Sequence, residues 1–327
     1  MKKNTKILLI NFGGIGDEIL FLPTIKAVRT KFSDAWITLC TEKRSRSIEN
    51  LTNLISDLKT IDNTKNRYFE LLKLTLWARA QKFDYVISSG SNQLIPLLLW
   101  LMGGKVRIGF SGSKFEKLLT SSVKLNKNQY AAEMYFDLVR DLTQENFELP
   151  KIEISEQNII KNSVLIHPGV SAMSRQKAII KTFSGQKWAK IIDSLLKNGR
   201  KVLLAGGPDD RQVYEEIIEN LENIGHENFI DYYGKTKNIM DLAHLINNAE
   251  TLCCSDSAPM HIGVALNKKV VAIFGPTDEK KLIPERENFI VVQNGCDCRP
   301  CLWDKRQTTC DELFCLKMKT DDIVSKL

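Results

Sequence analysis

Residues 250–278 read ETLCCSDSAPMHIGVALNKKVVAIFGPTD, and this stretch decides the fold. An apolar run that enters a polar loop, a helix of small residues, a second apolar run and a Gly-Pro-Thr turn are typical of two parallel strands joined by a helix. Such a unit brings hydroxyls, a carboxylate, a histidine and the first amides of a helix to the carboxyl edge of a sheet, where α/β folds bind ligands. We interpret this stretch as a site for a phosphorylated ligand.

The length of the chain predicts two domains. Its 327 residues are about twice the common domain size of roughly 150 residues. Apolar runs that enter loops alternate with helical patterns, first from Lys6 to Asn11 and again from Ser163 to Ile166. This alternation predicts the α/β class, with two Rossmann-like domains that face each other across a cleft. We place them at residues 1–150 and 151–327, with a linker within residues 143–163.

The composition is that of a soluble globular protein, with 43% hydrophobic and 26% charged residues. No apolar run approaches the roughly 20 residues that a membrane-spanning helix needs. The longest run, Leu94 to Met102, predicts a core helix, and a surface that touches a membrane is the alternative. The first apolar run breaks at Asn11 without a signal-peptide cleavage site, so we expect a cytoplasmic protein.

The net charge is mildly positive. The chain carries 46 basic and 39 acidic residues, a net charge of +7 that we interpret as spread along the chain. This charge is compatible with anionic substrates or with an anionic membrane surface. A nucleic-acid partner is not expected, because the sequence has no long basic run and no interleaving of basic and aromatic residues.

A glycine-rich loop follows the first expected strand. Gly13, Gly14 and Gly16 permit a tight turn and a close approach of a ligand to the backbone. The pattern is not GxGxxG, so it does not indicate a nicotinamide site. Asp17 opens the next helix and has two interpretations. It is either a carboxylate favoured in the first turn of a helix, or a general base that deprotonates an acceptor hydroxyl across the cleft.

The loop within residues 250–278 offers an anion site. Ser257 is placed to cap the following helix, and Pro259 falls in the first turn, where a missing N–H is tolerated. His261, one turn in, either has a structural role or reaches a phosphate or ribose. Lys181 is either a surface lysine or the cation that neutralises a departing diphosphate. No Asp-x-Asp pair follows an expected strand, so no divalent metal is expected to bridge phosphates.

Five of the eight cysteines fall between residues 296 and 315. In a cytosolic chain such crowding favours metal or redox chemistry over disulfides. Four of them, Cys298, Cys301, Cys310 and Cys315, have a spacing compatible with a four-thiolate zinc site. The alternative is a set of loop cysteines with a local structural role.

These motifs resemble glycosyltransferase family 9, the bacterial heptosyltransferases, whose members have the GT-B fold. The stretch NFGGIGDEILFLPTIKAVR is similar to the family's glycine-rich opening, whose aspartate is regarded as the catalytic base, and this implies that role for Asp17. The stretch HPGVSAMSRQKAIIKTFSGQKWAKI resembles the one in which a lysine precedes a Trp-Pro pair. The resemblance implies that Lys181 contacts the diphosphate, although this chain has Phe183 and Ser184 where the family usually has the Trp-Pro pair.

Further matches lie in the second half. LLAGGPDDRQVYEEI resembles a Gly-Gly-Pro turn with an acid near the nucleotide ribose, a role that falls on Asp210. SDSAPMHIGVAL resembles an Asp-Ser-Gly-Pro-x-His signature, with Ala258 in place of the usual glycine, and the Cys298–Cys301 segment resembles a late Cys-x-Pro-Cys cluster. The resemblance implies that the donor is bound by His167, Gly169, Gly207, Asp210, Asp256, Ser257, Ala258, His261, Gly275 and Thr277.

The resemblance implies an inverting, metal-independent transferase that moves heptose from ADP-heptose to a lipopolysaccharide core. The N-terminal half would bind the acceptor and the C-terminal half the donor, no cofactor would be required for catalysis, and the enzyme would contact the inner-membrane surface peripherally. Two alternatives keep the fold: another nucleotide sugar or glycan acceptor, or transfer of heptose onto protein. Two others change the class: an oxidoreductase with two Rossmann halves, or a nucleotide-sugar-binding module without turnover.

Overall fold

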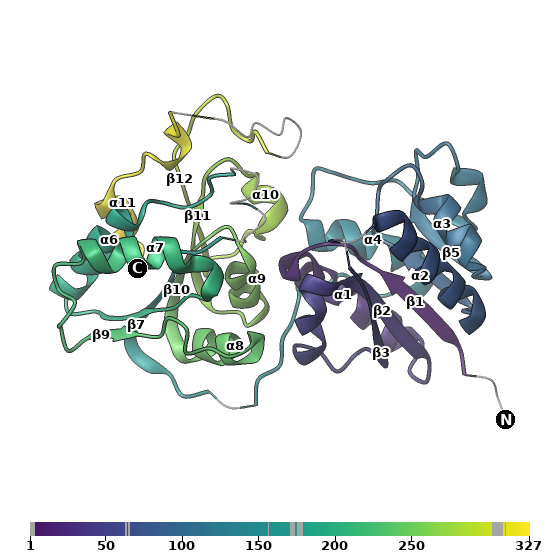
Figure 1. The fold of residues 1–327 in the computed structure, drawn as a ribbon, viewed down its shortest axis with the longest axis horizontal. Helices are drawn as coiled ribbons and strands as arrows, with labels where there is room; N and C mark the ends of the chain where they lie inside the picture. The colour runs from purple at the N-terminus through teal and green to yellow at the C-terminus, as the bar shows by residue number, and fades with distance from the viewer. Residues whose placement is uncertain are drawn as a thin grey trace. The chain divides into compact units, whose positions relative to one another are not determined.

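The computed structural model describes residues 4–62, 64, 66–155, 157–170, 174, 179–302, 310 and 312–327. The chain forms two compact units, Met1–Ile152 and Glu153–Leu327. The first is coloured purple to blue-green and the second teal to yellow (Figure 1). Each unit is built around a six-stranded sheet whose neighbouring strands are all parallel. The α/β class predicted from the alternating pattern is confirmed.

The first sheet has the strand order β3-β2-β1-β4-β5-β6. Its strands are β1 (Lys6–Ile10), β2 (Trp36–Glu42), β3 (Asp57–Ile61), β4 (Tyr85–Ser88), β5 (Val106–Phe110) and β6 (Ser121–Val123). The helices are α1 (Ile15–Lys31), η1 (Lys43–Asn50), α2 (Arg67–Gln81), α3 (Ile95–Met102), η2 (Glu116–Leu118) and α4 (Ala131–Thr143). The order reverses beside β1, so the Gly13–Asp17 loop leaves the sheet at the switch point where α/β folds bind ligands.

The second sheet has the order β12-β11-β10-β7-β8-β9. Its strands are β7 (Ile160–His167), β8 (Lys201–Leu204), β9 (Phe229–Asp231), β10 (Ala249–Ser255), β11 (Lys269–Phe274) and β12 (Phe289–Gln293). The helical elements are α6 (Gly185–Lys197), η3 (Pro208–Asp210), α7 (Arg211–Asn220), α8 (Ile239–Asn248), α9 (Ala258–Ala265), α10 (Glu279–Leu282), η4 (Phe314–Leu316) and α11 (Thr320–Val324). The sequence analysis predicts neither β6 nor β12, and both are edge strands.

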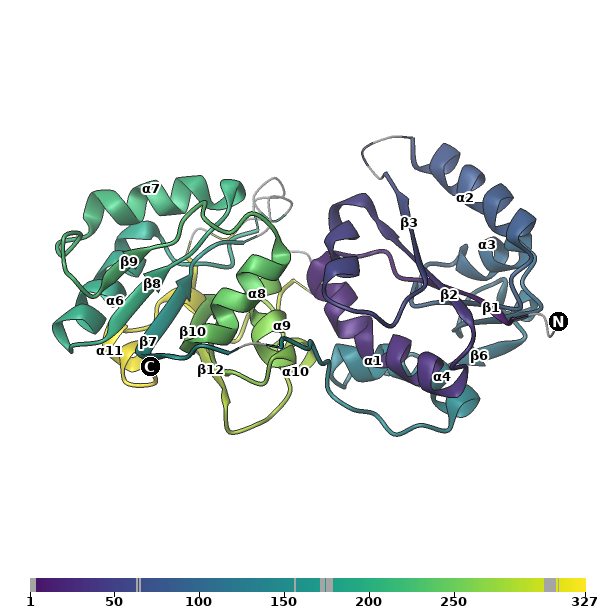
Figure 2. The same cartoon turned by 90° about the horizontal axis from the view of Figure 1, so that it is seen from below.

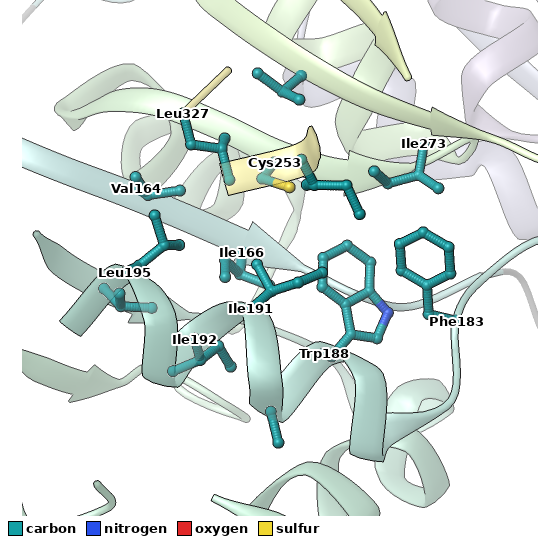
Figure 3. Packing of buried hydrophobic residues seen from close by; sticks show 14 of the residues in the cluster. Val164, Ile166, Phe183, Trp188, Ile191, Ile192, Leu195, Cys253, Ile273 and Leu327 are labelled. Carbon is teal, nitrogen blue, oxygen red and sulfur yellow. The ribbon is translucent and has the colours of Figure 1, made fainter. Parts of the chain in front are cut away.

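The core of the second unit lies between its sheet and α6. Trp188 is fully buried against Val164 and Ile166 of β7, and the ring of Phe183 packs beside it with 5.4 Å between the centroids (Figure 3). The indole nitrogen donates to Thr182 Oγ1 at 3.0 Å, which satisfies the one polar atom of the buried ring. The segment that carries Lys181 is therefore tied directly to the core.

Within the described part of the chain, no helix is both long enough and apolar enough to cross a membrane.

Candidate functional site

Three loops of the second unit leave its sheet at the same edge. β7, β10 and β11 are neighbours, and Cys254 pairs in register with His167 while Ser255 pairs with Ile273. The residues that follow these strand ends therefore lie together, as predicted from the 250–278 stretch. Part of the loop after β7, residues 171–173 and 175–178, lies outside the described residues.

Lys181 and Asp256 form an ion pair at this edge. Lys181 Nζ lies 2.9 Å from Asp256 Oδ2, and the two side chains are 20% and 4% exposed. A nearly buried carboxylate needs such a partner, since an unpaired charge there would be costly. An ammonium group has three N–H donors, so Lys181 can hold Asp256 and still meet an anion. The interpretation of Lys181 as an ordinary surface lysine is not what the structure shows.

Asp256 is held in its ionised form by its surroundings. Burial opposes ionisation, but the ammonium of Lys181, then His261 and the hydroxyl of Thr277, outweigh it, so the pKa of Asp256 is lowered. His261 and Thr277 are themselves buried. The structure thus brings together four residues spread over 96 positions of the sequence, Lys181, Asp256, His261 and Thr277.

Ser257 occupies the N-cap position of α9 but does not cap the helix with its side chain. Its hydroxyl donates to the carbonyl of Ser255 at 3.3 Å instead. The prediction of the position is correct and that of the capping hydrogen bond is wrong, because the hydroxyl is bonded to the end of β10 instead. The start of α9, with Ala258 as its first residue, is not closed by its own cap and remains suited to an anion.

Thr182 and Ser255, which the sequence analysis does not name, fix the position of Lys181. Thr182 Oγ1 donates to the carbonyl of Pro168 at 2.6 Å, and Ser255 Oγ lies 2.8 Å from Thr182 Oγ1. With the indole of Trp188 on the same hydroxyl, these bonds connect the loop after β7, the start of α6 and the end of β10. The only feature of the sequence that could have pointed to Thr182 and Ser255 is that each is next to a predicted site residue.

The side chain of Asp210 is more deeply buried than expected for a residue that contacts a ribose at the protein surface. Its Oδ2 accepts from the amide of Gly207 at 2.9 Å, and the side chain is buried against the loop after β7. A Cβ at Gly169 would fall 1.8 Å from Asp210 Oδ1, so position 169 has no space for a side chain. Burial lowers the pKa of His167, and the carboxylate of Asp210, 3.9 Å from Nε2, offsets this only in part.

The Gly275–Thr277 turn is braced by the Cys-x-Pro-Cys segment. Arg299 donates to the carbonyls of Gly275 at 2.5 Å and Thr277 at 3.1 Å, and to Glu279 Oε2 at 3.0 Å. The amide of Cys301 donates to the carbonyl of Pro276 at 2.9 Å. The guanidinium is almost fully buried. The sequence analysis misses Arg299, although its place inside the Cys-x-Pro-Cys pattern is a signal.

The thiols of the late cysteine cluster lie near one another. Cys296 Sγ is 3.4 Å from Cys298 Sγ, and burial, followed by the bond to Cys298, raises the pKa of Cys296 to about 11. Burial and then the neighbouring thiols also raise the pKa values of Cys301 and Cys315. Metals bind the thiolate rather than the thiol. Within the part of the chain that the structure describes, no group of three His, Cys, Asp or Glu side chains is placed to hold a metal ion. Residues 303–309 and 311, within this segment, lie outside the described residues, and the four-thiolate zinc site stays a prediction.

The glycine-rich loop of the first unit closes around Asp17. Asp17 Oδ2 accepts from the amide of Gly14 at 2.8 Å, so the helix-capping interpretation is realised. A Cβ at Gly13 would fall 2.5 Å from the Asp17 side chain, which explains the glycine there. Asp17 Oδ1 faces the hydroxyl of Tyr135 at 3.5 Å. Asp17 is only half-buried, so part of its side chain stays accessible.

Glu18, next to Asp17 in the first turn of α1, is a second carboxyl that the sequence analysis does not single out. It is fully buried, and its Oε1 accepts from Thr41 Oγ1 at 2.5 Å. Burial raises its pKa well above the ordinary value, against the opposing hydrogen bonds of Thr41 and Asn11. The only feature of the sequence that could have pointed to Glu18 is its position as an acidic residue at the start of an apolar helix. Asp17 and Glu18 therefore adjoin in sequence but occupy different environments.

A cavity of about 440 Å³ adjoins the second-unit site. It lies between the loop of Lys181 and α7, with Val170, Phe183 and Val213 among the side chains that line it. Ligand pockets commonly have volumes of about 300–1,000 Å³. A ligand bound at Lys181 therefore has room to extend away from the sheet edge.

Comparisons with known proteins agree on one family. The family model described as glycosyltransferase family 9 (heptosyltransferase) matches residues 72–311. The chain is 26% identical to lipopolysaccharide heptosyltransferase 3 of Escherichia coli K12, over 86% of this chain and 85% of that protein.

The solved structures that are similar to this chain include two heptosyltransferases. E. coli ADP-heptose lipopolysaccharide heptosyltransferase II has a TM-score of 0.76 at 17% identity and covers 98% of this chain and 97% of its own. The iron-containing heptosyltransferase TibC, in complex with ADP-D-β-D-heptose, has a TM-score of 0.62 at 14% identity. The match covers 100% of this chain and 76% of the TibC chain. The likeness shows the GT-B fold.

Proposed function

The chain belongs to glycosyltransferase family 9, the heptosyltransferases, and we propose from this premise that it moves heptose from ADP-heptose to a lipopolysaccharide core hydroxyl. The observation that carries the proposal is the ion pair between half-buried Lys181 and buried Asp256, beside the uncapped start of α9. A cation and a helix N-terminus at one sheet edge suit a diphosphate. As a glycosyltransferase, the enzyme belongs to the class predicted from the sequence.

The second unit would bind the leaving nucleotide. Lys181 neutralises charge on the diphosphate, and Asp256 holds the ammonium in place while His261 and Thr277 complete its surroundings. The turn at Gly275–Thr277, braced by Arg299, forms the adjoining wall. We propose that these groups carry the charge of the departing diphosphate without a metal. Heptosyltransferase TibC is described as iron-containing, so metal dependence is part of the test.

The first unit would bind the acceptor. Asp17 takes the proton of the attacking hydroxyl as the C–O bond to the donor sugar forms and the bond to the diphosphate breaks, with inversion at the sugar carbon. One base is enough for such a displacement, unlike the two carboxylates of hydrolases. A lipid-linked acceptor would place the enzyme at the cytoplasmic face of the inner membrane.

A donor screen followed by mass analysis of the product tests the proposal. ADP-heptose should raise the thermal midpoint more than other ADP-sugars or UDP-sugars, because the midpoint depends on ligand affinity. Transfer should continue after chelation, with no zinc or iron needed in the purified protein. A stronger shift with another donor, or activity restored only by a metal, would contradict the donor or the metal-free mechanism respectively.

The role of Asp17 is tested in the same assay. Asp17→Asn retains an oxygen for the amide of Gly14 but loses the base, so kcat should fall by about 10²–10⁴ with donor affinity unchanged. Asp34→Asn, an exposed aspartate of the same unit, is the matched control. Full transfer by Asp17→Asn would rule out this base.

A further inference from the structure

Helix α2 carries apolar side chains on the face that points away from the sheet. Tyr68 and Leu76 are 81% and 61% exposed, and Phe69 and Leu72 are also exposed. The opposite face, with Leu74 and Ala78, packs into the core of the first unit. An amphipathic surface helix normally presents polar residues to water. Folding of the unit therefore does not account for the outward apolar face of α2.

Helix α3 has the same character. Leu99 and Met102 are buried, whereas Leu94, Trp100 and Leu101 are exposed. The prediction of a core helix for residues 94–102 is thus correct for one face only. Leu94 and Leu101 are seven residues apart and so lie on one side of the helix.

The two outward faces adjoin. Arg79 Nη1, one turn after Leu76 on α2, donates to the carbonyl of Leu101 on α3 at 3.1 Å. α2 and α3 also lie side by side in both views (Figures 1 and 2). The loop before η2 joins them, because Ser113 Oγ donates to the carbonyl of Gln93 at 2.6 Å, beside exposed Phe115. We call the exposed apolar residues of α2, α3 and this loop the α2–α3 face.

The stretch of sequence that contains this face is basic. Residues 66–129 contain ten Lys and Arg but three Asp and Glu, an excess of seven that equals the net charge of the whole chain. The interpretation of the charge as spread along the chain is wrong. Lys73 lies on α2 with its ammonium 4.3 Å from the Phe69 ring centroid and 3.2 Å from Glu70 Oε1, and its side chain is 58% exposed. Lys114 precedes Phe115. Exposed leucines and aromatics among lysines are the pattern of a surface that enters the headgroup region of an anionic bilayer.

We propose that the α2–α3 face docks on an anionic phospholipid membrane. The leucines and aromatic rings enter the headgroup boundary, and the lysines and arginines meet lipid phosphates. A second copy of the chain fits less well, because two such faces would bring their positive charges together. The inference deepens the proposed function, on which it rests for the lipid-linked acceptor, but vesicle binding needs neither donor nor acceptor.

Flotation with phosphatidylcholine vesicles, with and without phosphatidylglycerol, tests the docking. The protein should bind the anionic vesicles and be released by high salt. Leu72→Ser/Leu76→Ser should lower the partition coefficient by at least about tenfold, and Lys73→Gln/Lys114→Gln by about fivefold per charge. The matched control is Ile224→Ser, an equally exposed apolar residue of the second unit. Brominated lipid should quench Trp100, and Trp100→Phe should remove that quenching.

Equal binding by the wild type and the Leu72→Ser/Leu76→Ser variant would overturn the inference, as would a solution dimer that this variant abolishes. A thermal midpoint equal to that of the wild type shows that a variant is folded. If the Leu72→Ser/Leu76→Ser variant does not fold, vesicle binding by the Lys73→Gln/Lys114→Gln variant tests the docking instead. On a delipidated, water-soluble acceptor the leucine variant should be as active as the wild type. If neither transfers heptose, the proposed function fails while the vesicle result still decides the docking.

Discussion

At the scale of single residues, the Lys181–Asp256 pair should dominate the pH response of the second unit. The folded-state pKa of Asp256 is lowered, so the pair's contribution is fully present above the unfolded pKa of about 3.9 and is lost as the pH falls through the folded value. Asp256→Asn should destabilise the protein by roughly 3 kcal/mol at neutral pH, because it leaves the ammonium without its counter-charge.

Urea unfolding at neutral and acidic pH measures this effect. The difference in unfolding free energy between wild type and Asp256→Asn should shrink below about pH 4. Glu227→Gln removes an exposed carboxylate of the same unit and should change little at either pH. A difference that grows on acidification would contradict the pairing.

At the scale of elements, the Cys298–Cys301 segment should act through the turn it braces. Arg299→Ala leaves the carbonyls of Gly275 and Thr277 without their charged donor, which should cost roughly 3 kcal/mol and raise the KM for the donor. Urea unfolding and steady-state kinetics check both effects. Arg286→Ala, an exposed arginine between α10 and β12, serves as the control. A stable variant with an unchanged KM would show that the turn holds its shape without Arg299.

At the scale of the whole molecule, the two units should respond separately to the nucleotide. Hydrogen exchange with ADP should show slower exchange in residues 164–170 and 250–278 of the second unit, because a ligand at Lys181 and the start of α9 suppresses local opening there. The Gly13–Asp17 loop belongs to the first unit and should exchange as before. Protection centred on that loop instead would reverse the assignment of donor and acceptor units.

The sequence by itself determined the class of each half and most element positions. Alternating patterns and continuous apolar runs are local properties of the sequence. The strands β1, β10 and β11 are mostly buried apolar runs, so they can be recognised from the sequence alone. Asp17, Asp256 and His261 were singled out because each lies beside an expected strand end or helix start, and the family resemblance assigned roles to Asp17 and Lys181; these roles stay predictions. Strands β6 (Ser121–Val123) and β12 (Phe289–Gln293) were missed.

Only the tertiary structure decided which distant side chains meet. Asp256 lies 75 residues from Lys181, and Arg299 lies 24 residues from Gly275. Parallel strand register sets these pairings, and no local propensity encodes them. The structure likewise turned Ser257 away from its expected cap and placed the apolar faces of α2 and α3 together in water. Periodicity tells that a helix has an apolar face, but only packing decides whether that face is covered.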